Sequence, residues 1–214
     1  MSEEVKRSYD ASRRKELAKA SRQRVLAAAR RRFLTDGYVA TTIAGIAEEA
    51  GVSVKTVNKV FGSKAGLLKA LFDVAIVGDD EPVPLASRDF ITAMHAEPDS
   101  RVKLAMFAKV LASMLPRTAP LQLLIRQASG DPSIGTIWEQ IHGGRLMGMT
   151  DFATNLSAGG HLRDGVTMQD ARDVLWACSS PELYDLLVLH RGWTADQYAE
   201  FIESTAAAAL LPMR

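Results

Sequence analysis

Apolar residues recur along most of the chain at the three- and four-residue spacing of one helix face. Runs that alternate apolar and polar residues are rare, and no Asn-Gly or Asp-Gly hairpin turn stands between two such runs. The pattern therefore predicts an all-α protein.

The first long helical pattern runs from about residue 21 to residue 36, and Gly37 is expected to end it. Its apolar face carries Val25, Leu26, Ala29 and Phe33. Residues 1–20 are polar with basic pairs, and we interpret them as a mobile arm that becomes helical near Glu16. A basic arm can reach a phosphate or a minor groove, and it can equally remain a solvated tail.

Three shorter helices are predicted next, each preceded by a residue that can cap its first amides. The second helix covers residues 43–50, the third covers 54–61 and the fourth starts near residue 64. The expected caps are Thr41 or Thr42, Ser53 and Ser63, and the expected stop of the second helix is Gly51.

Residues 78–84 are polar and rich in proline, and they interrupt the helical pattern. We place the domain boundary here, which gives a basic arm (1–20), a helix-turn-helix domain (21–78) and a helical domain (79–214). The last domain is expected to hold helices over 88–96, 98–115, 119–129, 132–158, 168–190 and 195–211. Ser179-Ser180-Pro181 either kinks the helix over 168–190 or splits it in two.

Charge is divided unevenly along the chain, although the net charge is only +1. Residues 1–75 carry 15 Lys and Arg against 8 Asp and Glu, a net charge of +7, and the remainder has a net charge of −6. A basic first third attached to an acidic remainder indicates either a polyanion-binding segment or a solvated charged helix.

Residues 42–61 form the pattern of two short helices joined by Gly51-Val52-Ser53, which is a helix-turn-helix. Val57 and Phe61 lie four residues apart, so both face the preceding helix. The outward face then carries polar and basic side chains and lacks bulky apolar ones. A glycine-linked helix pair is often only structural, but the basic charge of this segment favours DNA binding.

The outward side chains have the chemistry that major-groove recognition requires. Lysine donates to guanine, asparagine pairs with adenine, and threonine contacts a thymine methyl group or a phosphate. Helix N-terminal amides nearby can hold phosphates. The predicted DNA-binding residues are Thr41, Thr42, Ser53, Lys55, Thr56, Asn58, Lys59, Ser63 and Lys64.

Residues 22–72 resemble the DNA-binding domain of the TetR (tetracycline-repressor-like) family. The resemblance is carried by Phe33, Gly37-Tyr38, Thr41-Thr42-Ile43, Ile46-Ala47, Ala50-Gly51-Val52-Ser53, Thr56, Phe61, Ser63-Lys64 and Leu67-Leu68. It implies a homodimer of about nine helices, with a ligand-binding domain after the fourth helix and release of the DNA operator on ligand binding. The chain departs from the family at Asn58 and Lys59, where aromatic residues that touch phosphates are usual.

The last two helical segments are candidates for a homodimer interface over residues about 168–211. One apolar stripe comprises Leu183, Leu186, Leu187 and His190, and the other comprises Tyr198, Phe201, Ile202, Thr205 and Ala209. The alternative is that both stripes face the core of their own subunit; the family resemblance favours the interface.

Large adaptable apolar side chains in the middle helices mark a candidate pocket for an unknown small-molecule effector. His142 and Arg145 would supply polar contacts there, although such apolar residues more often belong to a core. The predicted ligand-binding residues are Met106, Trp138, His142, Arg145, Met149, Phe152 and Trp176.

Other functional classes find little support. No apolar run is long enough for a membrane helix, the four histidines are far apart, and no nucleotide-binding or nucleophile motif occurs, so we expect no metal, no cofactor and no enzyme. A single cysteine, Cys178, and a charged N-terminus without a secretory signal favour a cytoplasmic protein. The alternative function is a helical small-molecule-binding or scaffolding protein whose DNA recognition has degenerated.

Overall fold

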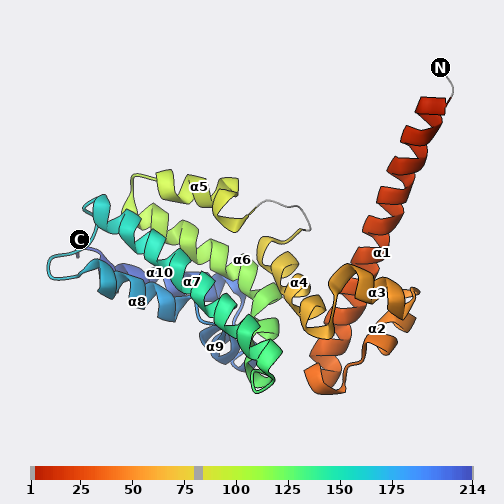
Figure 1. The fold of residues 1–214 in the computed structure, drawn as a ribbon. Helices are drawn as coiled ribbons and strands as arrows, with labels where there is room; N and C mark the ends of the chain where they lie inside the picture. Colours follow the sequence, from red (N-terminus) through yellow and green to blue (C-terminus); the bar gives the residue numbers. More distant parts are fainter. Residues whose placement is uncertain (1–2, 80–83, 214) are drawn as a thin grey trace. The chain divides into compact units, whose positions relative to one another are not determined.

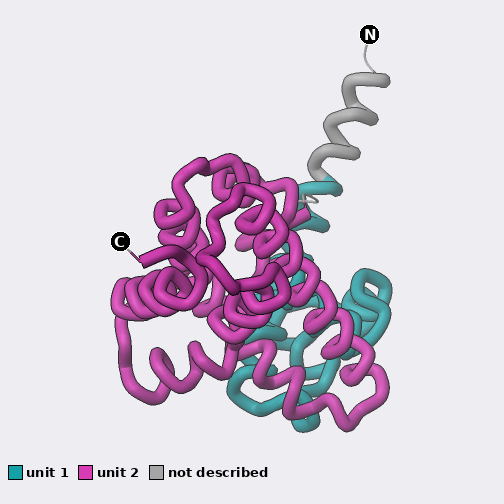
Figure 2. Tube along the Cα trace, turned by 90° about the vertical axis from the view of Figure 1, so that its left-hand side faces the viewer, with its two compact units in different colours: residues 1–73 teal, residues 74–214 magenta. Residues whose placement is uncertain are grey.

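The computed structural model describes residues 3–79 and 84–213, with side chains from residue 14 onward (Figure 1). These residues form helices and loops without a strand, which confirms the predicted all-α fold. The chain divides into two compact units, residues 1–73 and residues 74–214 (Figure 2). The division falls inside helix α4, a few residues before the predicted boundary. Part of the predicted linker, residues 80–83, lies outside the described residues.

The first unit is built from α1 (Glu3–Ala40), α2 (Ile43–Ala50), α3 (Val54–Phe61) and the start of α4 (Lys64–Val77). The predicted helix start near Glu16 was wrong, because α1 is already helical from Glu3. Gly37 is non-helical, with a φ of 79°, so the predicted break there is confirmed. The core of this unit comprises Val25, Leu26, Ala29, Phe33, Ile46, Ala47, Val57, Phe61, Leu67, Leu68, Leu71 and Phe72.

The second unit contains a short 3₁₀ turn (Leu85–Ser87) followed by α5 (Asp89–Ala96), α6 (Ser100–Gln127), α7 (Pro132–Ala158) and α8 (Met168–Cys178). It ends with α9 (Pro181–Tyr184), a π-helical segment (Asp185–His190) and α10 (Ala195–Leu210). Asp131 caps α7, and capping boxes at Thr167 and Thr194 start α8 and α10.

Helix α6 corrects the prediction of two helices over 98–115 and 119–129, because it continues through Pro116 and Pro120. Side chains of the same stretch hydrogen-bond to carbonyl groups of the preceding turn. The Arg117 guanidinium donates to the Ser113 carbonyl at 2.7 Å, and the Thr118 hydroxyl donates to the Met114 carbonyl at 3.2 Å. Burial of Leu115, Ala119 and Leu121 holds the helix to its neighbours on both sides of the prolines.

The segment 168–190 is split rather than kinked. Ser179 ends α8, and the Ser180 hydroxyl accepts a hydrogen bond from the Leu183 amide at the start of α9. In the π-helical segment that follows, Leu186 and Leu189 are 57% and 52% exposed. The unit therefore leaves an apolar surface on this part of the predicted interface.

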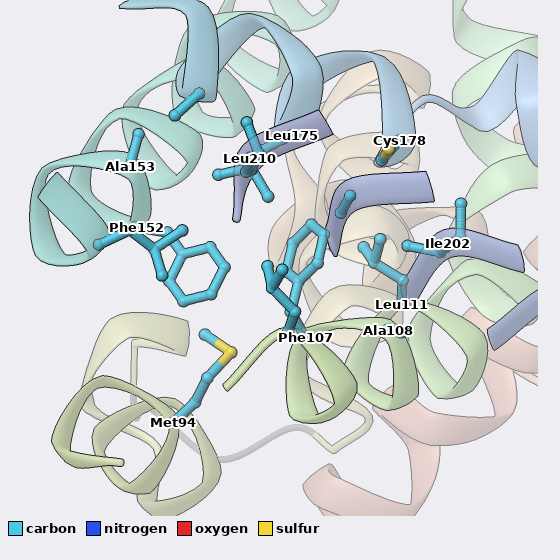
Figure 3. Close-up of a cluster of buried hydrophobic side chains, with 14 of the residues drawn as sticks. Met94, Phe107, Ala108, Leu111, Phe152, Ala153, Leu175, Cys178, Ile202 and Leu210 are labelled. Carbon is cyan, nitrogen blue, oxygen red and sulfur yellow. The ribbon is translucent and has the colours of Figure 1, made fainter. Parts of the chain in front are cut away.

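The core of the second unit lies between α6, α7, α8 and α10 (Figure 3). Phe107 of α6 stacks against Phe152 of α7 with ring centroids 5.2 Å apart. Tyr198 and Ile202 of α10 are fully buried in this core, so part of the predicted α10 interface stripe faces its own subunit. The Tyr198 hydroxyl donates to the Cys178 carbonyl at 3.3 Å, and burial raises the pKa of the Cys178 thiol to about 11.

Candidate nucleic-acid interface and ligand cluster

The helix-turn-helix geometry arises from local capping. The Thr42 hydroxyl accepts from the Gly45 amide at 3.1 Å and starts α2, and the Ser53 hydroxyl accepts from the Thr56 amide at 3.1 Å and starts α3. Between them Gly51 has a φ of 64°, a left-handed conformation that costs glycine little. The turn therefore forms where the sequence predicts it.

Helix α3 has one buried side and one exposed side. Val57 and Phe61 are 1% and 9% exposed and anchor α3 within the first unit. The opposite side exposes Lys55, Thr56, Asn58 and Lys59, as predicted. The spacing of the two anchors thus fixes which polar side chains point outward.

The exposed side of α3 also carries two apolar residues that the sequence reasoning missed. Val54 is 43% exposed and Val60 is 48% exposed. Their place beside a polar face is compatible with contact to thymine methyl groups in a major groove. The sequence offered one signal for their exposure. Val54 directly follows the cap Ser53 and Val60 directly precedes the buried Phe61, so neither shares the face of the two buried anchors.

Two of the predicted DNA-binding side chains form contacts within the first unit instead. Thr41 is 2% exposed, and its hydroxyl donates to the Gly37 carbonyl at 2.7 Å. The Lys64 ammonium donates to the carbonyls of Tyr38 at 2.8 Å and Thr41 at 3.0 Å, and lies 4.2 Å from the centre of the Tyr38 ring. Both side chains therefore hold the connection between α1 and α2.

Several arginines of α1 also hold α2, which accounts for part of the basic charge. Arg31 and Arg32 both pair with Glu49, and their hydrogen bonds, that of Arg31 above all, lower the pKa of this carboxyl group. The Arg24 Nε donates to the Ala50 carbonyl at 3.1 Å. Arg22 lies over the Phe61 ring at 4.9 Å, which places a basic residue of α1 beside α3.

The predicted ligand-binding residues separate into two groups. Trp138, His142 and Arg145 lie on one face of α7 and meet Trp176 of α8. The His142 ring is 3.9 Å from Trp138 and 5.3 Å from Trp176, measured between centroids. In contrast, Met106, Met149 and Phe152 belong to the core of the unit or pack against it.

Arg145 is the centre of this group, which we call the tryptophan cluster: Trp138, His142, Arg145 and Trp176. Its guanidinium carbon lies 3.3 Å from the centre of the Trp176 ring. Its Nη1 donates to the Trp176 carbonyl at 2.6 Å and to the Ser179 hydroxyl at 2.9 Å, at the C-terminal end of α8. Burial lowers the pKa of Arg145 to about 10.

The tryptophan cluster should make the protein less stable in mild acid. Burial, and secondarily the charge of Arg145, lower the pKa of His142 below its usual 6.5. Between about pH 6.5 and the folded-state pKa, the unfolded chain binds a proton that the folded protein does not, so the free energy of unfolding falls as the pH is lowered. Urea unfolding from about pH 7 to pH 5 should show a smaller loss for His142→Gln than for the unmodified protein. Equal losses in both would contradict this assignment.

A groove outside the predicted ligand residues lies beside the end of α4. It has a volume of about 420 Å³ and is lined by residues that include Phe90, Lys109 and Met114. The Arg117 Nε in its wall donates to the Ala75 carbonyl of α4 at 3.0 Å. The sequence pattern offered no signal for this groove, since it depends on how α4, α5 and α6 come together.

Among the residues that the structure describes, no three His, Cys, Asp or Glu side chains are grouped so as to hold a metal ion. None of the helices in this described part combines the length and the apolar character needed to span a bilayer.

Comparison with known proteins relates the first unit to a family and the whole chain to a fold. Residues 25–71 match the model of "Bacterial regulatory proteins, tetR family". The sequence matches no curated protein.

Solved structures of similar fold cover nearly the whole chain. A protein described as a transcriptional regulator from Saccharomonospora viridis, in complex with choline, is 21% identical, with a TM-score of 0.66 over 90% of this chain and 98% of its own. The regulator FadR from Bacillus subtilis, in complex with stearoyl-CoA, is 19% identical, with a TM-score of 0.66 over 87% and 98%. A protein described as a TetR-family regulator from Mesorhizobium loti is 17% identical, with a TM-score of 0.64 over 91% and 98%.

Proposed function

We propose that this chain, whose residues 25–71 match the model of bacterial regulatory proteins of the tetR family, is a cytoplasmic transcriptional repressor that binds a palindromic DNA operator as a homodimer. A small, largely apolar ligand releases the operator. The observation that carries the proposal is the exposed polar face of α3, presented by the buried Val57 and Phe61. A helix with such a face fits the major groove, where its side chains reach base edges.

Within this face we assign different roles to different side chains. Lys55 and Lys59 supply charge for guanine edges or phosphates, and Asn58 suits adenine. The exposed hydroxyl groups of Thr42 and Ser63 stand at the N-termini of α2 and α4, where amides favour a phosphate. Phosphate contacts set the position on DNA, and base contacts select the sequence.

The homodimer is supported by exposed apolar residues in the predicted interface. Leu186 and Leu189 of the π-helical segment would be removed from water by a second copy of the same segment about a two-fold axis. A symmetric pair of reading helices requires an operator with matching symmetry, which is why we propose a palindrome.

Control by a ligand is supported by the similar folds that bind one. The Saccharomonospora viridis protein was solved with choline and FadR with stearoyl-CoA, two chemically unrelated ligands. In this chain the ligand-binding candidates remain the seven predicted residues, of which the tryptophan cluster combines polar and aromatic groups.

Lys55→Ala combined with Lys59→Ala should weaken operator binding by about tenfold or more, because each lysine contributes a charge-assisted hydrogen bond. The slope of log affinity against log salt should fall by about 0.9 for each phosphate that the variant no longer neutralises. DNA fragments selected with the full-length protein, followed by anisotropy titrations at several salt concentrations, measure both quantities.

Lys109→Ala is the matched control, since Lys109 is an exposed lysine of the second unit. It should leave affinity and salt slope unchanged. Equal affinities for the double variant and the unmodified protein would refute the proposal. Weak binding without sequence preference, together with ligand affinity, would favour a small-molecule-binding protein with degenerate DNA recognition.

A further inference from the structure

Arg145 is a half-buried cation whose hydrogen bonds among the described residues all go to neutral groups. Its partners among the described residues are the Trp176 carbonyl and the Ser179 hydroxyl. Its Nε is buried and has no hydrogen-bond partner in the described part of the chain. Buried charges are normally paired with an opposite charge, because burial without a counter-ion is costly. Arg145 thus retains the capacity for an anionic partner.

His142 presents a second unsatisfied group in the same cluster. Its Nε2 is buried and also has no hydrogen-bond partner among the described residues. The imidazole stands one turn before Arg145 on α7, between the rings of Trp138 and Trp176. Two buried polar nitrogens without hydrogen-bond partners therefore lie in one cluster of aromatic side chains. This is uncommon, because most buried polar atoms in proteins are hydrogen-bonded.

The surrounding charges offset the charge of Arg145 only in part. The nearby carboxylate is Glu182, and it accepts a hydrogen bond from Arg126 at 2.5 Å. The charge of Glu182 favours the protonated form of Arg145, but Glu182 is hydrogen-bonded to Arg126, and the Arg145 guanidinium has no hydrogen-bonded counter-ion among the described residues. The flat faces of the indoles favour a flat apolar group, and the guanidinium fork favours a two-oxygen anion.

The tryptophan cluster is partly accessible to solvent. The four side chains of the cluster are themselves only half-buried. A ligand can therefore approach these side chains from solvent.

We propose that the tryptophan cluster binds a planar aromatic carboxylate, with its oxygens on Arg145 and His142 and its ring against Trp138 and Trp176. This inference deepens the proposed function, on which it rests, by naming the chemical class of the effector. A quaternary ammonium ligand is disfavoured at this site, because Arg145 already lies on the face of Trp176 and would repel a second cation.

The test uses the full-length protein with 2-naphthoate, 2-naphthamide and choline as probes. Calorimetry should show naphthoate binding about tenfold or more tightly than the uncharged amide of the same shape, a difference of about 1.4 kcal/mol. Indole N–H resonances locate the site, because Trp138 and Trp176 belong to the cluster and Trp193 packs against Phe201 instead. Naphthoate should shift two of the three indole signals and leave that of Trp193 in place.

Arg145→Met keeps much of the side-chain volume and removes the charge, so naphthoate should lose about tenfold or more in affinity while naphthamide keeps its own. Because Arg145 also contacts the end of α8, this variant can fail to fold. His142→Phe then serves instead, since it keeps an aromatic ring and removes Nε2, and it should weaken naphthoate more than naphthamide.

Equal affinities for the acid and the amide, tighter binding of choline, no naphthoate binding at millimolar concentration, or a response confined to Trp193 would each overturn the inference. Operator binding is measured on the same preparation. Specific DNA binding without naphthoate binding removes the inference and leaves the proposed function standing. Naphthoate binding at the cluster without specific DNA binding would support the binding site and refute the proposed DNA-binding function.

Discussion

Replacing Phe61 by alanine should lower the free energy of unfolding of the first unit by about 3–5 kcal/mol and abolish operator binding. Phe61 is the larger of the two anchors that seat the eight residues of α3, and it is 9% exposed. A helix of this length has little stability of its own, and its position therefore depends on the burial of Phe61. Urea unfolding followed by circular dichroism and anisotropy titration on selected DNA measure the two effects.

Val60→Ala is the control for stability, because Val60 precedes Phe61 on α3 but is 48% exposed. Its free energy of unfolding should change by less than about 0.5 kcal/mol. If Phe61→Ala destabilised the protein no more than Val60→Ala does, the anchoring role of Phe61 would be wrong.

Lys103→Ala should lower the free energy of unfolding by about 3 kcal/mol, because it leaves a cavity and removes two hydrogen bonds. The side chain is 3% exposed, and its ammonium donates to the Asn155 Oδ1 at 2.5 Å and to the His95 carbonyl at 3.2 Å. These bonds join α6 to α7 and to the end of α5. Chemical unfolding monitored by circular dichroism measures the loss.

Lys103→Met separates the two causes. It fills most of the volume and removes a buried charge whose pKa is lowered by desolvation, so we expect a loss below about 1.5 kcal/mol. A loss as large as that of Lys103→Ala would show that the hydrogen bonds to Asn155 and His95 dominate, and would contradict the cavity account.

Helix starts were the most predictable part of the fold, because capping depends on residues within one turn. The predicted caps Thr42, Ser53 and Ser63 each accept a hydrogen bond from the amide three residues on. Proline was a poorer guide. Pro116 and Pro120 predict a break, yet the neighbouring Arg117 and Thr118 bond to the preceding turn, and buried contacts hold α6 in one piece.

The sequence predicts the part of each candidate site that lies on a single helix, because residue spacing determines which side chains share a helix face. The outward face of α3 follows from the spacing of Val57 and Phe61, and the shared face of Trp138, His142 and Arg145 follows from their spacing on α7. The addition of Trp176 depends on how α7 and α8 pack, which no local pattern specifies. For the same reason Phe152, predicted to bind ligand, lies in the core against Phe107 (Figure 3).

The buried state of Cys178 makes site-specific labelling straightforward. The thiol stays protonated at neutral pH, because its pKa is raised to about 11, and the side chain is 4% exposed. Maleimide reagents react with an accessible thiolate, so the native cysteine is inert toward them. A cysteine introduced outside the proposed interface, for example by Thr136→Cys at an exposed position of α7, would carry a single fluorophore without removal of the native thiol. Energy transfer between labelled copies would then report their association directly.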